Sequence, residues 1–186
     1  FNLYFGCLKG TPYRWLNVWE LAHRLAPKAA QVVEVRYFTA RTKPQPGYPP
    51  PANQSVYLRA LATLPKVTVH FGEFRGHIKS LPEHPPPANG APPKLVKVYK
   101  SDEKGSNVNL ASYLLLDGFR GHYEHALVVS NDSDLATPVR MVRDDLKKPI
   151  TIAFPCGKAA SRPACCARRA PGGSRCASPR SDVPCS

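Results

Sequence analysis

The sequence predicts an α/β protein with a Rossmann-like parallel sheet flanked by helices. Three observations support this prediction. Apolar, β-branched runs alternate with helical patterns along most of the chain, and that alternation is typical of parallel sheets with helices on both faces. The composition is 42% hydrophobic, which is enough for a packed core. The length of 186 residues is that of one ordinary domain.

The first half of the domain shows two helix–strand alternations. Residues 15–25, "WLNVWELAHRL", carry apolar side chains three and four residues apart, and this spacing predicts an amphipathic helix. "QVVEVRYFTA" (31–40) is rich in β-branched and aromatic residues and predicts a buried strand. The same criteria predict a loop over 43–51, a helix over 53–64 and a strand over 66–74.

The second half begins with a proline-rich stretch, residues 81–94, which predicts irregular structure because proline lacks a backbone donor. "KLVKVYK" (94–100) predicts a short strand. "SNVNLASYLLLDGF" (106–119) predicts a helix with Ser106 as its N-cap. The remaining patterns predict a strand over 125–130, a helix over 134–148 and a last strand over 149–154.

Residues 155–186 differ from the preceding domain, residues 1–154. From Cys156 onward the chain has no Leu, Ile, Met, Phe, Tyr or Trp, so it cannot bury enough surface to offset its ordering entropy. The segment holds five of the six cysteines, but no C-x-x-C pair, which argues against structural zinc. We expect a disordered tail, and translation in a shifted reading frame is an alternative explanation of its composition.

Charge and cysteine usage indicate partners and compartment. The net charge is +13, which favours a polyanionic partner, with RNA the expected one; a merely basic surface is the alternative. No run of about 18 apolar residues occurs, so no membrane span is expected. Cys7 is the single cysteine before residue 156, and a disulfide framework would need more, so we expect a cytoplasmic protein. The oligomeric state is not indicated.

Two carboxylates, Asp132 and Asp134, follow the strand predicted over 125–130. Ligands of parallel α/β sheets bind at the carboxyl ends of strands, and two close carboxylates are a typical place for a Mg²⁺ or Mn²⁺ ion. The alternative is that Asp132 caps a turn and Asp134 caps the next helix. Haloacid-dehalogenase phosphatases also place D-x-D after a strand, but Ala136 stands where their motif has Thr or Val. Glycosyltransferases use D-x-D to hold the metal ion of a nucleotide-sugar, but this chain is short for their two-part substrate site.

Three segments in order resemble the NYN domain, a branch of the PIN-like nucleases: "FNLYFG" at the start, "EKGSNVNLASYLLLDGF" (103–119) and "YEHALVVSNDSDLATPVRMV" (123–142). The resemblance covers most of residues 1–154. It implies a PIN-like fold and a metal-dependent ribonuclease, a hydrolase that cleaves RNA phosphodiester bonds. The alternative is a catalytically inactive RNA-binding module of the same fold.

The resemblance also implies site residues. The family's S-x-D-S-D element is present as Ser130, Asp132, Ser133 and Asp134, and the two aspartates would hold Mg²⁺ or Mn²⁺. Its K-G-x-D element ends here in Asn107, which brings an oxygen but no charge. Phe1-Asn2 would be the last two residues of D-G-x-N, whose Asp, with the strand before it, would lie upstream. Activity would therefore be impaired or absent.

The same resemblance implies how RNA would be cleaved and held. A metal-bound water would attack the phosphodiester without a covalent intermediate, and Asn2 and Ser130 would contact the substrate. Arg140, Arg143 and Lys147 fall on one face of the predicted helix and are candidates for phosphate contacts, with a solvated face as the alternative. Arg75, His77 and Lys79 form a second candidate patch. Glu103 is expected to be an exposed loop acid, and His122 and His125 surface or packed side chains.

Overall fold

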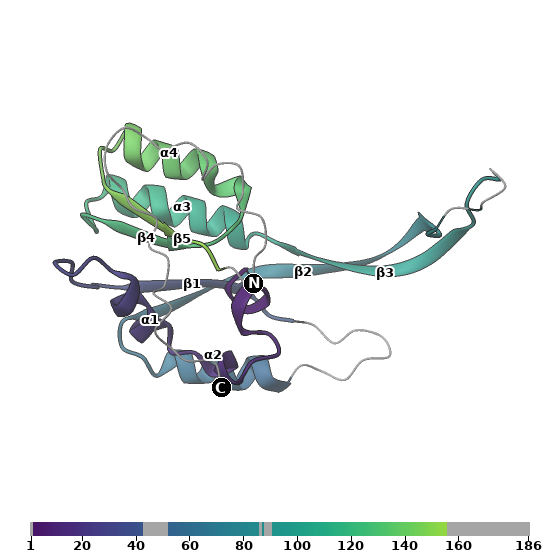
Figure 1. Ribbon diagram of the computed structural model, residues 1–186, viewed down its shortest axis with the longest axis horizontal. Coiled ribbons are helices and arrows are strands. Elements are labelled where there is room, and N and C mark those ends of the chain that lie inside the picture. The colour runs from purple at the N-terminus through teal and green to yellow at the C-terminus, as the bar shows by residue number, and fades with distance from the viewer. Residues whose placement is uncertain (1, 43–51, 86, 88–90, 156–186) are drawn as a thin grey trace.

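The computed structural model describes residues 2–42, 52–85, 87 and 91–155. Strands form the middle of the molecule, with α1 and α2 on one side and α3 and α4 on the other (Figure 1). The α/β class with helices on both faces is therefore confirmed. No helix within the described ranges is long and apolar enough to cross a membrane.

The strands form two sheets. The first has the order β1-β2-β3, with β1 at Val35–Ala40, β2 at Val67–Pro82 and β3 at Leu95–Lys104. β1 runs parallel to the first residues of β2, with Val35 opposite Val67. The rest of β2 pairs antiparallel with β3, so the prediction of a wholly parallel sheet is wrong here. β2 and β3 are longer than predicted because each satisfies the other's backbone hydrogen bonds.

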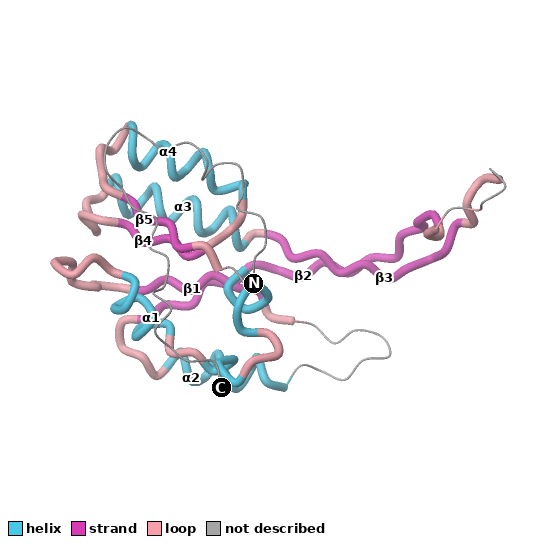
Figure 2. Tube along the Cα trace, viewed as in Figure 1, coloured by secondary structure: helices cyan, strands magenta, loops and turns pink. Residues whose placement is uncertain are grey.

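The antiparallel part, residues 73–82 of β2 with β3, is here called the arm. It projects from the rest of the molecule as a two-stranded ribbon (Figures 1 and 2). The predicted irregular stretch 81–94 starts later than expected, since Leu81 and Pro82 still belong to β2. Ile78 and Tyr99 lie opposite each other on the arm and are exposed by 72% and 47%.

The second sheet pairs β4 (Ala126–Val129) in parallel with β5 (Ile150–Ala153). The connection runs through a 3₁₀ turn at Ser133–Leu135 and α4 at Ala136–Asp144. Both strands were predicted within one residue at each end. The helix was predicted to reach residue 148 but ends at Asp144, because the amides of Leu146 and Lys148 turn back to the carbonyls of Met141 and Val142.

The other helices also lie close to their predicted positions. α1 spans Val18–Leu25, α2 Ala52–Ala62 and α3 Ser106–Phe119. α1 starts three residues late because the Asn17 side chain accepts the amides of Trp19 and Glu20 and so caps the helix there. The predicted N-cap Ser106 is wrong. Gly105 caps α3 in the left-handed conformation (φ 95°), which glycine adopts freely.

The core has two parts, one on each sheet. Val18 of α1 packs with Leu58 and Leu61 of α2 against β1 and β2. On the other side, the second core joins α3, β4 and the α4 region through Leu114, Ala126, Val128, Leu135 and Val142. The predicted loop over 43–51 and the tail from residue 156 lie outside the described residues.

Candidate functional site

The residues after β4 form a hydrogen-bonded turn at the carboxyl edge of the sheets. The Ser130 hydroxyl accepts hydrogen bonds from the Asn2 amide nitrogen (2.9 Å) and from the Asp132 backbone N–H (3.2 Å). Asp132 Oδ1 accepts the backbone N–H of Asp134 (3.1 Å) and caps the 3₁₀ turn. Asp132 thus caps a turn, which was the alternative to its binding a metal ion. Asp134 is exposed.

Asn107 completes this turn from α3. Its amide nitrogen donates to Asp132 Oδ2 at 2.5 Å. Both carboxylate oxygens of Asp132 therefore have a hydrogen-bond partner. The sequence placed Asn107 beside Asp132, and the structure brings the two together, as a donor and an acceptor rather than as two metal ligands.

Glu103 and Ser106 lie at the start of α3, next to Asn107. The Glu103 side chain accepts the Ser106 backbone N–H (2.9 Å), and Glu103 is a half-buried residue of β3, so its expected place in an exposed loop is wrong. Ser106 is 6% exposed, and among the described residues its hydroxyl has no hydrogen-bond partner. A buried hydroxyl of this kind is exceptional and is a natural contact for a ligand.

A cavity of about 390 Å³ opens beside these residues. Asn2, Glu103, Ser106, Asn107 and Asp132 line its end at the carboxyl edge. Residues of β1 and β4 line the cavity. β1 is paired with β2 in the first sheet, and β4 is paired with β5 in the second. Ligands of α/β sheets bind beyond the carboxyl ends of the strands, and this end of the cavity, here called the cavity mouth, lies there.

The donor set for a metal ion is small. Within the described ranges, no group of three or more His, Cys, Asp or Glu side chains comes close enough to hold an ion. Asp132 and Glu103 are the carboxylates that line the cavity near Asn107. Such a set fits a hydrated ion held by one or two carboxylates, and not a cage built from protein ligands alone.

A second polar cluster, which the sequence analysis missed, lies at the opposite end of the same cavity. Arg36 of β1 pairs with Asp117 of α3 (2.7 Å), which is 8% exposed. His122 Nδ1 lies 3.3 Å from Asp117 Oδ1. The signal that could have revealed it was a carboxylate within the apolar run "YLLLDGF". The partner Arg36 has no comparable signal, since it is 81 residues away.

Aromatic rings surround Arg36. Its guanidinium lies over the Tyr113 ring (4.9 Å to the centroid). The ring centroids of His70 and Tyr113 are 4.2 Å apart, and the His70 ring stacks on that of Phe38. Burial, and next the charge of Arg36, lower the pKa of His70. His122 and His125 were expected to be surface or packed side chains. The His122 side chain is half-exposed, and His125 Nε2 lies 2.8 Å from the Thr151 hydroxyl oxygen.

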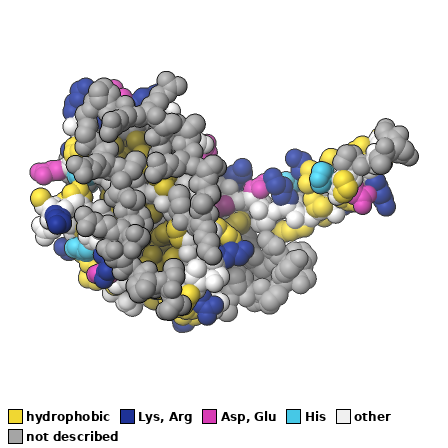
Figure 3. All heavy atoms as spheres, viewed as in Figure 1, with side chains coloured by type: hydrophobic (Ala, Val, Ile, Leu, Met, Phe, Trp, Pro, Cys, Tyr) yellow, Lys and Arg dark blue, Asp and Glu magenta, His cyan; other side chains and the backbone are white. Residues whose placement is uncertain are grey.

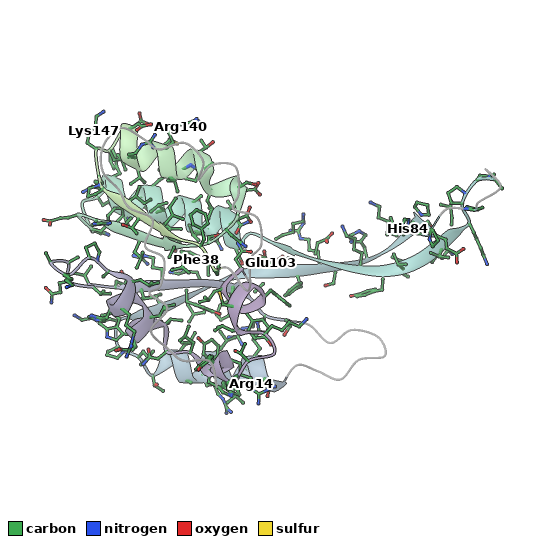
Figure 4. All side chains as sticks on the ribbon, in the orientation of Figure 1. Arg14, Phe38, His84, Glu103, Arg140 and Lys147 are labelled. Carbon is green, nitrogen blue, oxygen red and sulfur yellow. The ribbon has the colours of Figure 1, made fainter. Side chains whose placement is uncertain are left out.

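The predicted phosphate contacts lie away from the cavity. Arg140 and Lys147 are at the outer part of the α4 region, whereas Phe38 and Glu103 are near the middle of the molecule (Figure 4). Arg143 is paired with Asp144 (2.6 Å), and Lys147 follows the helix in a left-handed conformation (φ 55°). The prediction that Arg140, Arg143 and Lys147 share one helical face is therefore wrong for Lys147, which lies beyond the end of α4.

The chain is similar to 6-hydroxy-3-succinoylpyridine 3-monooxygenase HspA of Pseudomonas putida. The two are 26% identical over 165 residues, which cover 77% of this chain and 53% of that protein. The chain thus spans about half the length of this curated relative. No family model matches the sequence, and no solved structure matches it.

This similarity corrects the functional expectation. The relative is named as an oxidising enzyme, and its name indicates an oxidoreductase rather than a hydrolase. The prediction of a metal-dependent ribonuclease, with an inactive RNA-binding module as its alternative, is overturned by this finding. The resemblance to NYN domains stays a prediction, as do the roles assigned to individual site residues.

Proposed function

We propose that the chain is part of a monooxygenase-type enzyme acting on a small hydroxylated, nitrogen-containing aromatic compound. The observation that carries this proposal is the similarity over 165 residues to an enzyme named for such a substrate. The position of the cavity mouth supports it, because a small ligand of an α/β protein is expected at the carboxyl ends of the strands. The NYN-like fold is retained as a proposal about architecture alone.

The residues at the cavity mouth have the chemistry for such a ligand. Asp132 can accept the proton of an aromatic hydroxyl, which makes the ring more electron-rich where oxygen is added. Asn107 holds this carboxylate in place through its 2.5 Å hydrogen bond. The hydroxyl of Ser106 can bond a ring substituent. A monooxygenase reaction also consumes O₂ and two electrons, which a reduced flavin or nicotinamide would supply.

We include Mg²⁺ or Mn²⁺ in the proposal as a weakly held, hydrated ion. Asp132 would bind it, and Glu103 lines the same cavity. When bound, the ion would supply positive charge for an anionic oxygen of the substrate.

The experiment measures binding and turnover with the full-length polypeptide. We expect 6-hydroxy-3-succinoylpyridine to change the tryptophan fluorescence, and O₂ uptake in the presence of reduced nicotinamide and flavin to yield a product labelled from ¹⁸O₂. Asp132→Asn should abolish labelling, whereas the exposed Asp134→Asn is the matched control and should retain it. Absence of both binding and O₂ uptake in the full-length protein would refute the proposal.

RNA is proposed as a partner of the surface, separately from the reaction. The support is the net charge of +13 and one face of the arm. On this face the register brings together five basic side chains and two acidic ones, Glu73 and Asp102, which pair with Arg75 and Lys100; the basic ones are Arg75, His77, Lys79, Lys100 and Lys104. Basic side chains are visible along the arm (Figure 3). Affinity for a single-stranded RNA should fall steeply with salt. Lys79→Glu with Lys100→Glu should lower this affinity and flatten its salt dependence more than Arg140→Glu with Arg143→Glu does. Equal effects of the two pairs would exclude the arm.

A further inference from the structure

The arm has two faces of different chemistry. Successive side chains of a strand point to opposite faces, so the register of β2 and β3 assigns each residue of the arm to one face. One face holds the basic side chains proposed to contact RNA, together with Glu73 and Asp102, and is here called the charged face. The opposite face is here called the apolar face, and it consists of Phe74, Gly76, Ile78, Ser80, Pro82, Leu95, Lys97, Tyr99, Ser101 and Glu103.

The apolar face is uncovered along the arm. In the body of the molecule α3 covers this side of β2, where the Ser106 amide lies beside Gly72. Farther out, the arm projects without any described helix over it (Figure 1). Large apolar side chains are therefore open to solvent there: Ile78 is exposed by 72%, Leu95 by 65% and Tyr99 by 47%. An exposed apolar patch of this kind is typical of a docking surface.

The size of the apolar face sets the kind of interface that it can form. An isolated two-stranded ribbon is marginally stable in water and gains stability from a surface packed against it. Ten residues in each strand make the arm about 30 Å long, and its face is about 10 Å wide. Two such faces in contact would bury on the order of 600–1,000 Å² in total, which is the size of a weak, reversible interface.

The charges of the two faces differ in the contacts that they permit between identical copies of the chain. The charged face has more basic than acidic side chains, so two copies of it repel each other. The apolar face carries one charge of each sign, Lys97 toward the tip of the arm and Glu103 at its base. With two arms antiparallel, each Lys97 comes near the Glu103 of the other copy. With the arms parallel, like charges would meet instead.

We propose that the apolar face docks on the same face of a second copy of the chain, with the two arms antiparallel. The two-fold axis passes near Ile78 and Tyr99, which are the middle pair of residues on this face. Pro82 and Leu95 at the tip of one arm then lie over Phe74 at the base of the other. The four strands form two layers about 10 Å apart, and both charged faces stay on the outside. The inference goes beyond the proposed function and does not depend on it.

The test measures the dissociation constant of the dimer by sedimentation of the full-length polypeptide at about 1–300 μM. The wild type should dimerise with a Kd in the micromolar range. Ile78→Ser with Tyr99→Ser should raise this Kd by about tenfold or more, because both substitutions remove apolar area from the centre of the interface. Val96→Ser with Val98→Ser, on the charged face, is the matched control. It shares the loss of β-propensity and should leave the Kd within about twofold.

A second pair of variants tests the orientation of the arms. Lys97→Glu and Lys79→Glu lower the net charge equally, but Lys97 lies on the apolar face and Lys79 on the charged face. Lys97→Glu should give a Kd about threefold or more above that of Lys79→Glu, because it brings carboxylates of the two copies together. Equal Kd values for these two variants would overturn the antiparallel arrangement.

Three further outcomes would overturn the proposal as a whole. The first is a monomer at every concentration. The second is a dimer that both pairs of serine substitutions weaken equally. The third is a dimer that forms only after residues 156–186 are deleted, which would indicate that this segment of the same chain occupies the apolar face. None of these measurements uses substrate, so the result is independent of the oxidation assay.

Discussion

Arg36 and Asp117 form a forked ion pair that joins the two halves of the molecule. Arg36 Nε and Nη2 donate to the two carboxylate oxygens at 2.7 and 3.3 Å. Arg36 belongs to β1 in the first sheet, and Asp117 belongs to α3, which covers the second sheet as well. Two parallel hydrogen bonds fix the relative orientation of the two groups, which a single contact could not do.

Removing one member of this pair should destabilise the protein more than removing both. Asp117→Leu leaves the partly buried Arg36 with the more exposed Glu34 (3.2 Å) as its remaining carboxylate partner and should cost about 1–3 kcal/mol of unfolding free energy. The double variant Arg36→Met with Asp117→Leu replaces the pair by apolar groups and should cost less than Asp117→Leu alone. Urea unfolding of the three proteins measures this difference. An additive or larger loss in the double variant would show that the pair is not the relevant interaction.

His70 should make stability depend on pH. Its pKa is lowered in the folded protein by burial and by Arg36, so protonation favours the unfolded state. Stability is therefore full above the unfolded pKa of about 6.5 and falls as the pH drops from there through the folded pKa. His70→Phe should flatten urea midpoints between about pH 5 and 7, with His77→Phe on the arm as control. An unchanged pH profile in His70→Phe would exclude His70 as the source.

Asn107→Asp tests whether the turn can hold a divalent ion. The substitution replaces a hydrogen bond to Asp132 by two carboxylates in contact. Without metal, it should therefore destabilise the protein more than Asn107→Ala, by about 1–3 kcal/mol relative to the wild type. Millimolar Mn²⁺ should reverse the order of the two variants, since the ion binds two adjacent carboxylates more tightly than it binds Asp132 without this neighbour. Melting temperatures with and without Mn²⁺ give the answer, and an equal response of both variants would argue against an ion at Asp132.

Two glycines of β2 offer a matched pair of alanine substitutions. A Cβ at Gly72 would lie 2.5 Å from the Lys104 backbone oxygen and 2.9 Å from the Ser106 amide, neither of which can move without displacing α3. Gly72→Ala should cost about 1–3 kcal/mol. A Cβ at Gly76 would meet the hydroxyl end of Tyr99, an exposed side chain that can rotate away, so Gly76→Ala should be nearly neutral. Similar melting temperatures for the two variants would contradict the close packing at Gly72.

Local sequence patterns predicted those elements that depend on local interactions. The helix over 106–119 is found with both its ends, because its apolar residues recur at helical spacing and Gly105 stops β3 before it. The start of α1 was misplaced since the capping side chain, Asn17, lies inside the amphipathic pattern. The strand predicted from residue 31 begins at Val35, where pairing with β2 begins.

Long-range pairing could not be predicted in this way. The arm depends on hydrogen bonds between β2 and β3, and nothing in "EFRGHIKSLP" alone indicates an antiparallel partner. At the site, the sequence placed Ser130, Asp132 and Asn107 together correctly, but a D-x-D pattern does not distinguish a capping carboxylate from a metal ligand. The reaction class was predicted wrongly because a motif of five residues specifies a turn more reliably than a chemistry.

The arm also sets how this fold can change in length. Every residue of β2 from Glu73 to Pro82 faces one residue of β3, without a bulge. An insertion or deletion of two residues in each strand, at opposed positions, therefore preserves which side chains share a face. The helices lie beyond the base of the ribbon and would be untouched (Figure 1). Reach and surface chemistry at the tip are thus modular properties, able to diverge among related chains while the body of the domain stays the same.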